Sequence, residues 1–482
     1  MKKLITSVLV IVLLLSCSVV IFAACDTTDY DRTIIFYSQQ NDKLQAITAT
    51  AIAAFEAKYP DWKVRHDVIS NGYNGIRTKV VQDLQGKKQP DLAYCYPDHV
   101  ALYMQTEKVI DLKTLINSAE TVKDANGNDV RIGFTTDEIA NFVEAYYNEG
   151  LATNFTDYDR YGYEEDAMMV LPFVKSTELL FYNKTALTDA GLQPAKTWDE
   201  LWQQAPALAK KYTKATVLGY DSEANWFITE SERQGWGYTS VNKDKHYLFD
   251  NENVIEWLDD VIAVNADKGY ITTQQIYGNY TSNLFKMGVV DKKGSTNPDD
   301  WEQLGGAIYC VGSSGGATNQ ETNNFDWDVT TLPASVTANG QSDKCISQGP
   351  SLVMLNCDRA QNPDEKAKMT FLFMKELLSP QIQAAVSMEQ GYAPSIKGVE
   401  AVVPAYADFL AKADERNIKA MAVKLTKELA DAGKLFTSPC FVGSSTARDQ
   451  VGNALQYVIE QSKDGASAVK DALKNCGGNS SK

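Results

Sequence analysis

A short run of small and hydroxyl residues, Gly312-Ser313-Ser314-Gly315-Gly316, is well suited to contact a small polar group. Its backbone amides are unobstructed, and its two hydroxyls can both donate and accept hydrogen bonds, so an anion or a sugar hydroxyl would fit it. A flexible turn without a ligand is the alternative that the sequence leaves open. The run is not a nucleotide phosphate-binding loop, because no Lys-Ser or Lys-Thr pair follows it.

The same run matches the pattern Gly-x-Ser-x-Gly, in which Ser314 would be the nucleophile of a hydrolase. In that fold the catalytic histidine follows the serine, whereas the last histidine of this chain is His246. An apolar helix should also follow the nucleophile, yet residues 317–324 are polar. The sequence therefore argues against a serine hydrolase.

Aromatic side chains in or beside polar segments are a second candidate feature. A sugar ring has an apolar face that stacks on an aromatic ring, while carboxylates and amides bind its hydroxyls. Because the chain has 24 Tyr, 17 Phe and 8 Trp, most aromatic residues should belong to the core or the surface. The aromatic residues in polar surroundings are Tyr37, Tyr94, Tyr96, Trp226, Trp236, Tyr238, Tyr280 and Tyr392.

Other catalytic and metal chemistry has weak support. Paired carboxylates of a secreted glycosidase, such as Asp98, Glu178 and Glu200, are a distant alternative among 62 acidic residues. Three histidines and no Cys-x-x-Cys spacing predict no zinc site, and no cofactor is predicted. The run 124–129 looks like a calcium loop but lacks its Gly and Glu, so we predict a turn between strands.

The length and charge of the chain exclude some classes of protein. With 482 residues the chain should form two domains. The formal net charge of −16 disfavours nucleic acid and anionic membrane surfaces as main partners. An anionic small ligand remains possible, because a pocket can differ from the average surface.

The N-terminal segment predicts export and lipid attachment. Lys2 and Lys3 precede a largely apolar stretch over residues 4–22, and Ala23-Ala24-Cys25 then leads into a polar segment. Small residues before a cysteine resemble a bacterial lipobox, which implies a signal peptide over 1–24, a lipid on Cys25 and a tether over 25–32. Plain secretion and a retained anchor are the alternatives. Six further cysteines allow fifteen pairings, and the sequence does not choose among them.

Alternating strands and helices predict an α/β fold. Strands are expected at 33–38, 62–66 and 90–96, and the helices between them at 44–59 and 76–84. A second such pattern begins at 168–183, continues with helices over 198–212 and 254–266, and includes a strand over 327–332. Mostly helical segments follow at 366–378, 380–388, 404–414, 418–432 and 447–461, and a tail is expected at 475–482.

The order of these segments resembles the bacterial extracellular solute-binding protein family 1, the substrate receptors of ABC importers. Four stretches carry the resemblance: Pro90–Leu112, Leu171–Trp198 with its STELLFYNK and KTWDEL motifs, Trp327–Pro333, and Glu365–Ser395 ending in GYAPS. The resemblance implies a periplasmic-binding-protein-like fold, in which a ligand lies between two hinged α/β lobes. Residues 33–172 and 334–395 are expected to form lobe 1, and residues 173–333 and 396–474 to form lobe 2.

The resemblance also implies a function and a set of site residues. We expect a non-enzymatic, monomeric lipoprotein outside the cytoplasm that binds a carbohydrate and delivers it to ABC permease subunits. The Ser-Ser-Gly-Gly loop makes glycerol 3-phosphate or a glycerophosphodiester the alternative ligand. The residues expected to contact the ligand are Tyr37, Tyr96, Ser176, Glu178, Trp236, Ser313, Ser314, Gly349, Tyr392 and Arg448.

Overall fold

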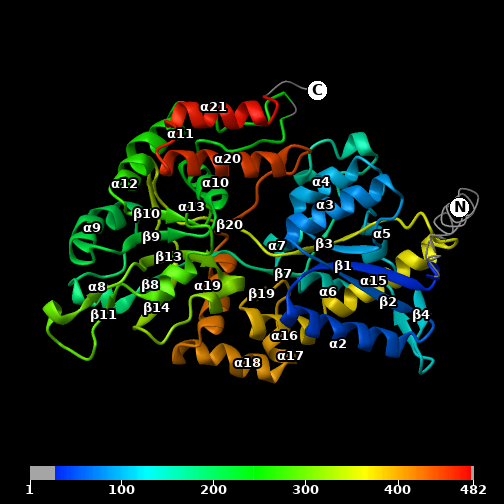
Figure 1. The fold of residues 1–482 in the computed structure, drawn as a ribbon. Coiled ribbons are helices and arrows are strands. Elements are labelled where there is room, and N and C mark those ends of the chain that lie inside the picture. Colours follow the sequence, from blue (N-terminus) through cyan, green and yellow to red (C-terminus); the bar gives the residue numbers. More distant parts are fainter. Residues whose placement is uncertain (1–27, 243, 479–482) are drawn as a thin grey trace, which may run out of the picture.

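The computed structural model describes residues 28–242 and 244–478. The chain forms two α/β lobes, each built around its own five-stranded sheet and its own hydrophobic core (Figure 1). Lobe 1 is the blue and cyan half of Figure 1 together with α15, and lobe 2 is the green half together with the red helices. The prediction of a two-lobed α/β fold is confirmed. Cys25 lies outside the described residues.

The sheet of lobe 1 begins as the predicted alternation of strands and helices. Its strand order is β2 (Lys63–Ile69), β1 (Thr33–Gln39), β3 (Leu92–Cys95), β18 (Ser351–Met354) and β6 (Leu171–Pro172), with β1 parallel to both β2 and β3. Helices α2 (Asp42–Lys58) and α3 (Gly72–Gln85) connect the parallel strands. The side chain of Asn41 caps α2 by accepting from the Leu44 amide at 3.2 Å.

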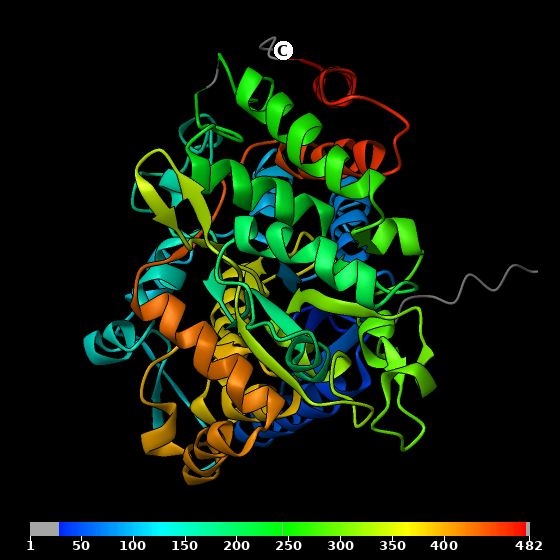
Figure 2. The same cartoon turned by 90° about the vertical axis from the view of Figure 1, so that its left-hand side faces the viewer.

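The sheet of lobe 2 repeats this arrangement. Its strand order is β10 (Ile271–Thr273), β9 (Thr216–Tyr220), β13 (Ala307–Ser313), β8 (Glu178–Asn183) and β14 (Trp327–Thr331). In both sheets three parallel strands are followed by one antiparallel strand contributed from elsewhere in the chain. Figure 2 shows lobe 2 from outside, with its green helices in front of the sheet.

Several predicted helices are confirmed with shifted ends: α9 (Trp198–Lys211), α15 (Pro363–Leu377), α16 (Pro380–Gln390), α18 (Pro404–Ala411), α19 (Ile418–Asp431) and α20 (Ser444–Ile459). The helix expected over 254–266 contains a π-helical segment, Trp257–Ala263 (η3), after α11 (Glu252–Glu256). The run 124–129 is the turn between β4 (Thr121–Lys123) and β5 (Asp129–Arg131), as predicted. Helices α10 (Glu223–Gln234) and α21 (Gly465–Asn475) were not predicted.

The segments that pass between the lobes lie side by side. Strand β7 (Val174–Lys175) pairs with β19 (Ala393–Pro394), and β17 (Cys345–Ile346) pairs with β20 (Leu435–Phe436). A further bridge joins Ser176 to Gln348. The lobes are therefore connected by a compact group of crossing segments, which we call the crossover.

Two features fix the crossover in place. Lys175 and Glu149, whose side chains are 1% and 6% exposed, form a buried ion pair, and the Ser347 hydroxyl donates to the same carboxylate at 2.5 Å. Gly349 has φ +98°, and a Cβ atom built on it would lie 2.4 Å from the carbonyl oxygen of Val174. Only glycine fits at this position without a shift of the backbone.

The lobe boundaries remain predictions, and the packing favours a different position for the second of them. Strand β15 (Ser335–Thr337) contacts α9 and α10, and Cys345 and Ile346 belong to the core of lobe 2. The chain joins the core of lobe 1 from Leu352. A boundary near residue 347 therefore fits the packing better than the expected boundary at 334.

Candidate functional site

Two adjoining cavities of about 80 and 200 Å³ lie between the lobes, and both are lined by Tyr96, Asp98 and Arg448. Tyr96 and Asp98 follow the carboxyl end of β3 in lobe 1, whereas Arg448 lies in the first turns of α20 in lobe 2. The smaller cavity also contacts Tyr238 and Gln348. Each cavity is therefore made of residues from both lobes, and we call the pair the interlobe site.

Three tyrosines form an aromatic cluster at the interlobe site. The ring centroids of Tyr73 and Tyr96 are 4.6 Å apart at an interplanar angle of 50°. Tyr392 completes the cluster: its hydroxyl is hydrogen-bonded to that of Tyr73. Its ring also lies against Gly315, where a Cβ atom would be 2.5 Å from the ring. Burial raises the pKa of Tyr73, Tyr96 and Tyr392, so all three hydroxyls stay protonated and able to donate.

A chain of polar side chains leads from the interlobe site into lobe 2. The Arg448 guanidinium donates to the Asn225 amide oxygen, and the Asn225 amide nitrogen donates to one oxygen of Glu178 at 2.8 Å. The Tyr220 hydroxyl donates to the other Glu178 oxygen at 2.6 Å. These hydrogen bonds hold the Arg448 side chain in one position.

Glu178 is 3% exposed, and burial raises its pKa from 4.5 to about 7, although hydrogen bonds from Tyr220 and Asn225 act in the opposite direction. Because the pKa is higher in the folded state, the fold gains stability from the protonated carboxyl. This contribution is complete below about pH 4.5, is lost as the pH rises toward 7, and is absent above pH 7.

Glu178→Gln should remove this pH dependence, since the amide resembles the protonated acid. Between pH 4 and pH 8 the free energy of unfolding of the natural protein should fall by about 3 kcal/mol more than that of the variant. Urea unfolding at each pH measures the difference. Two pH profiles that run parallel would show that Glu178 does not titrate in this range.

Charged groups line the larger of the two interlobe cavities. Arg77 of lobe 1 and Asp449 of lobe 2 are 4.0 Å apart across it. The buried His99 ring also lines it, and burial lowers the pKa of His99 to about 4, so this ring is neutral at pH 7. Guanidinium and carboxylate groups thus both face the cavity, and they can bind either hydroxyls or an anion.

The serine and glycine residues expected in the site lie at the crossover. The Ser313 hydroxyl contacts that of Ser176 at 3.4 Å. Ser314 is bound to the backbone of Thr177, because its hydroxyl accepts from the Thr177 amide at 3.1 Å and its amide donates to the Thr177 carbonyl at 2.8 Å. The flexible turn that the sequence left open as an alternative is not observed, because Ser314–Asn319 form a 3-10 helix. Ser314 and Gly349 therefore shape the crossover, Ser176 is buried within it at 2% exposure, and Ser313 is half-buried at its edge.

Two residues expected in the site lie elsewhere. Tyr37 is 4% exposed in the core of lobe 1 and donates to Asp83 at 2.8 Å. Its neighbours from Ile34 to Ser38 are also buried, so β1 has no solvent-facing side from which Tyr37 could reach a ligand. Trp236 lines a separate cavity within lobe 2. The structure brings neither residue to the interlobe site.

Other residues of the interlobe site were missed by sequence analysis. Tyr73 lies in the first turn of α3 after an Asn-Gly pair, which gives no sign of a binding residue. Asn225 and Tyr220 lie on α10 and β9, and α10 was not recognised as a helix. A signal for Asn225 was present in Ser222, whose hydroxyl accepts from the Asn225 amide at 3.3 Å as a helix cap.

Some negative findings apply to the described part of the chain. In residues 28–242 and 244–478 there is no cluster of three or more His, Cys, Asp or Glu that could hold a metal ion, and no helix is long and apolar enough to cross a bilayer. The six described cysteines, Cys95, Cys310, Cys345, Cys357, Cys440 and Cys476, are all free. Cys440 is buried beside the smaller interlobe cavity.

Glu200, one of the acids considered for a glycosidase, accepts from the Lys196 amide at 2.7 Å as part of a helix cap.

Two α/β lobes with an aromatic and polar site between them define a solute-receptor class of protein. The chain belongs to the bacterial extracellular solute-binding protein family, whose model matches residues 50–414. Membership of this family places the protein outside the cytoplasm and confirms the resemblance seen in the sequence.

Curated relatives with significant similarity are periplasmic proteins named for sn-glycerol-3-phosphate binding, UgpB. The protein from Pectobacterium atrosepticum is 27% identical over 242 residues, which cover 48% of this chain and 50% of that protein. The protein from Yersinia pestis is 24% identical over 349 residues, which cover 70% of this chain and 69% of that protein. The chain thus spans about half the length of the first relative.

Solved structures confirm the fold. The GacH receptor of Streptomyces glaucescens, studied with acarbose, has a TM-score of 0.67 and 18% identity, and the match covers 93% of this chain and 99% of the receptor. UgpB from Mycobacterium tuberculosis, solved with glycerophosphocholine, has a TM-score of 0.67 and 17% identity, with 92% and 97% coverage. At these identities the likeness concerns the fold alone.

Proposed function

We propose that this protein is the receptor of an ABC importer, that it binds a carbohydrate between its lobes, and that it delivers the ligand to membrane permease subunits as a monomer without catalytic activity. The observation that carries this proposal is the interlobe site. There Tyr73 and Tyr96 of lobe 1 line the same cavity as Arg448 of lobe 2. Aromatic rings would stack on the apolar face of a sugar, and the polar groups would bind its hydroxyls.

Ligand binding and hinge closure are coupled in this proposal. A ligand that touches both lobes stabilises the closed form, because the full set of contacts exists only when the lobes are together. The crossover is where such bending would occur, since all connections between the sheets pass through it. Small-angle scattering should therefore show a smaller radius of gyration once the ligand is bound.

Glycerol 3-phosphate or a glycerophosphodiester is the second candidate ligand. Arg448 lines both interlobe cavities, and a guanidinium binds phosphate oxygens in a bidentate manner. The relatives named for glycerol 3-phosphate and the Mycobacterium tuberculosis structure with glycerophosphocholine also support this candidate.

A thermal-shift screen of sugars, glycerol 3-phosphate and glycerophosphodiesters is expected to identify the ligand. At a hundred times its dissociation constant, a ligand stabilises the folded protein by about 2.7 kcal/mol.

Arg448→Met should weaken phosphate-ligand binding at least a hundredfold, because about 3 kcal/mol of charge-assisted hydrogen bonding is lost. The same variant should weaken the binding of a neutral sugar only about tenfold. If none of these compounds produced a shift or compaction, the proposed function would be wrong.

We also propose that a lipid on Cys25 holds the mature protein at the membrane. A diacylglycerol and an amide-linked chain would together anchor it firmly, because each buried methylene contributes about 0.8 kcal/mol. Cys25→Ser is expected to move the protein from the membrane fraction to the medium without any change in ligand affinity. Fractionation and immunoblotting measure this, and a variant that stayed on the membrane would mean that the anchor is misassigned.

A further inference from the structure

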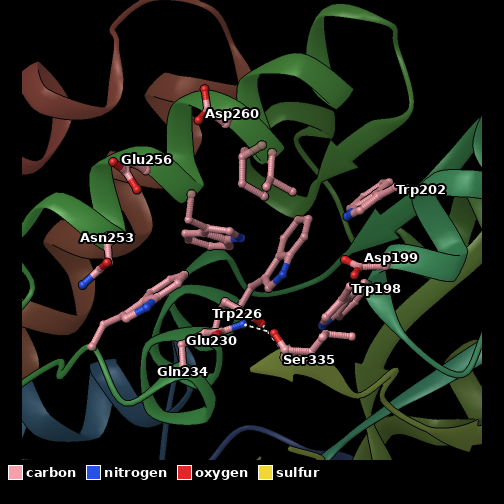
Figure 3. A pocket seen from close by; sticks show the side chains of 15 residues that line it. Trp198, Asp199, Trp202, Trp226, Glu230, Gln234, Asn253, Glu256, Asp260 and Ser335 are labelled. Carbon is pink, nitrogen blue, oxygen red and sulfur yellow. Dashed lines mark hydrogen bonds between the residues drawn. The ribbon is translucent and has the colours of Figure 1, made fainter. Parts of the chain in front are cut away.

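Lobe 2 contains a further cavity, separate from the two interlobe cavities. Tryptophan side chains line it, and the proposed function does not use it. It has a volume of about 280 Å³ and lies between α9, α10, η3 and β15 (Figure 3). None of its lining residues belongs to lobe 1 or lines the interlobe site. Five of the eight tryptophans of the chain surround it: Trp198, Trp202, Trp226, Trp236 and Trp257. We call this cavity the tryptophan pocket.

Three of the indole rings, Trp198, Trp202 and Trp226, are close to parallel, with interplanar angles of 19° to 31°, whereas Trp257 has a different orientation. Trp226 stacks on Tyr220 with centroids 4.7 Å apart and an angle of 4°, which covers one of its faces. Trp257 stands nearly perpendicular to Trp226, at 6.4 Å and 76°. Trp202 and Trp236 are only half-buried, so they present ring surface to the cavity and to solvent.

The charged side chains that line the tryptophan pocket are all acidic, and the buried Arg233 guanidinium lies behind Ser335, to which it donates at 3.4 Å. Asp199, Glu230, Glu256 and Asp260 line the pocket, whereas no Lys, Arg or His does. Glu230 is 5% exposed and accepts from the Ser335 hydroxyl at 2.6 Å and from the Gln234 amide at 2.8 Å (Figure 3). The other three carboxylates are exposed, on α9 on one side and on α11 and η3 on the other.

We propose that the tryptophan pocket binds a small organic ammonium ion, such as an alkylated amine. Indole faces attract a cation through their quadrupole, by about 2 kcal/mol when the cation is desolvated, and the carboxylates add attraction of the same sign. Carboxylates repel an anion. A neutral sugar would find rings, acceptors and the amides of Gln234 and Asn253 here, but only a cation also gains from the negative charge of the carboxylates. This proposal does not depend on which ligand binds between the lobes.

Choline chloride and its uncharged isostere 3,3-dimethylbutan-1-ol test this proposal on the full mature protein. Calorimetry and tryptophan fluorescence should show saturable binding of choline, with the neutral isostere at least tenfold weaker. Trp202→Ala and Asp260→Asn should each weaken choline binding several-fold. Trp301→Ala is the matched control, because Trp301 does not line the pocket and should leave the affinity unchanged.

Several outcomes would overturn the proposal. Equal affinity for choline and the neutral isostere would mean that charge plays no part in recognition. Binding of glucose or maltose that is sensitive to Trp202→Ala, without any binding of choline, would make the pocket a sugar site. Choline binding that is lost in Arg448→Met and kept in Trp202→Ala would place the cation between the lobes instead.

Discussion

Lys175→Met is expected to lower the free energy of unfolding by about 3–5 kcal/mol, because it leaves the buried Glu149 carboxylate without its cation. The remaining hydrogen bond from Ser347 cannot balance a full charge inside the protein. The midpoint of urea unfolding, followed by circular dichroism, measures the loss. The double variant Lys175→Met/Glu149→Leu should recover most of it, since no buried charge is then left.

A matched control for this variant is available on the surface. Lys63 pairs with Glu56 at 3.1 Å, but the side chain of Lys63 is 62% exposed, so Lys63→Met should change stability by less than about 1 kcal/mol. If Lys175→Met were as mild as this control, or if the double variant were no more stable than the single one, the buried pair would not hold the crossover together.

Gly349→Ala is expected to destabilise the protein by about 3 kcal/mol or more. The positive φ of Gly349 is unfavourable for alanine, and the added methyl group would also meet the Val174 carbonyl oxygen at 2.4 Å. Calorimetry should show a lower melting temperature. Because Gly349 shapes the crossover, ligand-induced compaction should weaken as well, even under conditions in which the variant is folded.

Gly127→Ala separates the cost of a positive φ from the cost of the steric contact with Val174. Gly127 has φ +82° but nothing lies within 4 Å of a Cβ atom built there, so only the backbone penalty of about 1–2 kcal/mol applies. The difference between the two variants then measures the steric conflict at the crossover. Equal destabilisation by both would show that Val174 moves away without cost.

Much of the fold could be predicted because periodicity and turn residues act locally. The alternation over residues 33–96 predicted three strands and two helices, and β1, α2, β2, α3 and β3 confirm it. Helix α10 was missed for a physical reason: charged residues such as Glu230 and Arg233 occupy its buried face. Arg233 donates to the Pro333 and Lys344 carbonyls, partners that are distant in sequence and so leave no apolar pattern.

The candidate site was predicted in part. Tyr96, Glu178 and Arg448 were expected in the site, and the structure joins them through contacts between segments hundreds of residues apart. Tyr37 and Trp236 lie away from the interlobe site, because the polar neighbours of an aromatic residue in the sequence do not determine which face of the fold it occupies. Whether the joined residues contact a ligand stays a prediction.

Because Cys440 is buried beside the interlobe site, the reactivity of its thiol should report whether the two lobes are together or apart. Burial raises the pKa of this thiol, so it is protonated and unreactive while the lobes are together. Separation of the lobes would admit solvent to the cavity that Cys440 lines. The rate at which Cys440 itself is alkylated would then rise with the fraction of time that the lobes are open, and a bound solute would slow it by keeping the lobes shut.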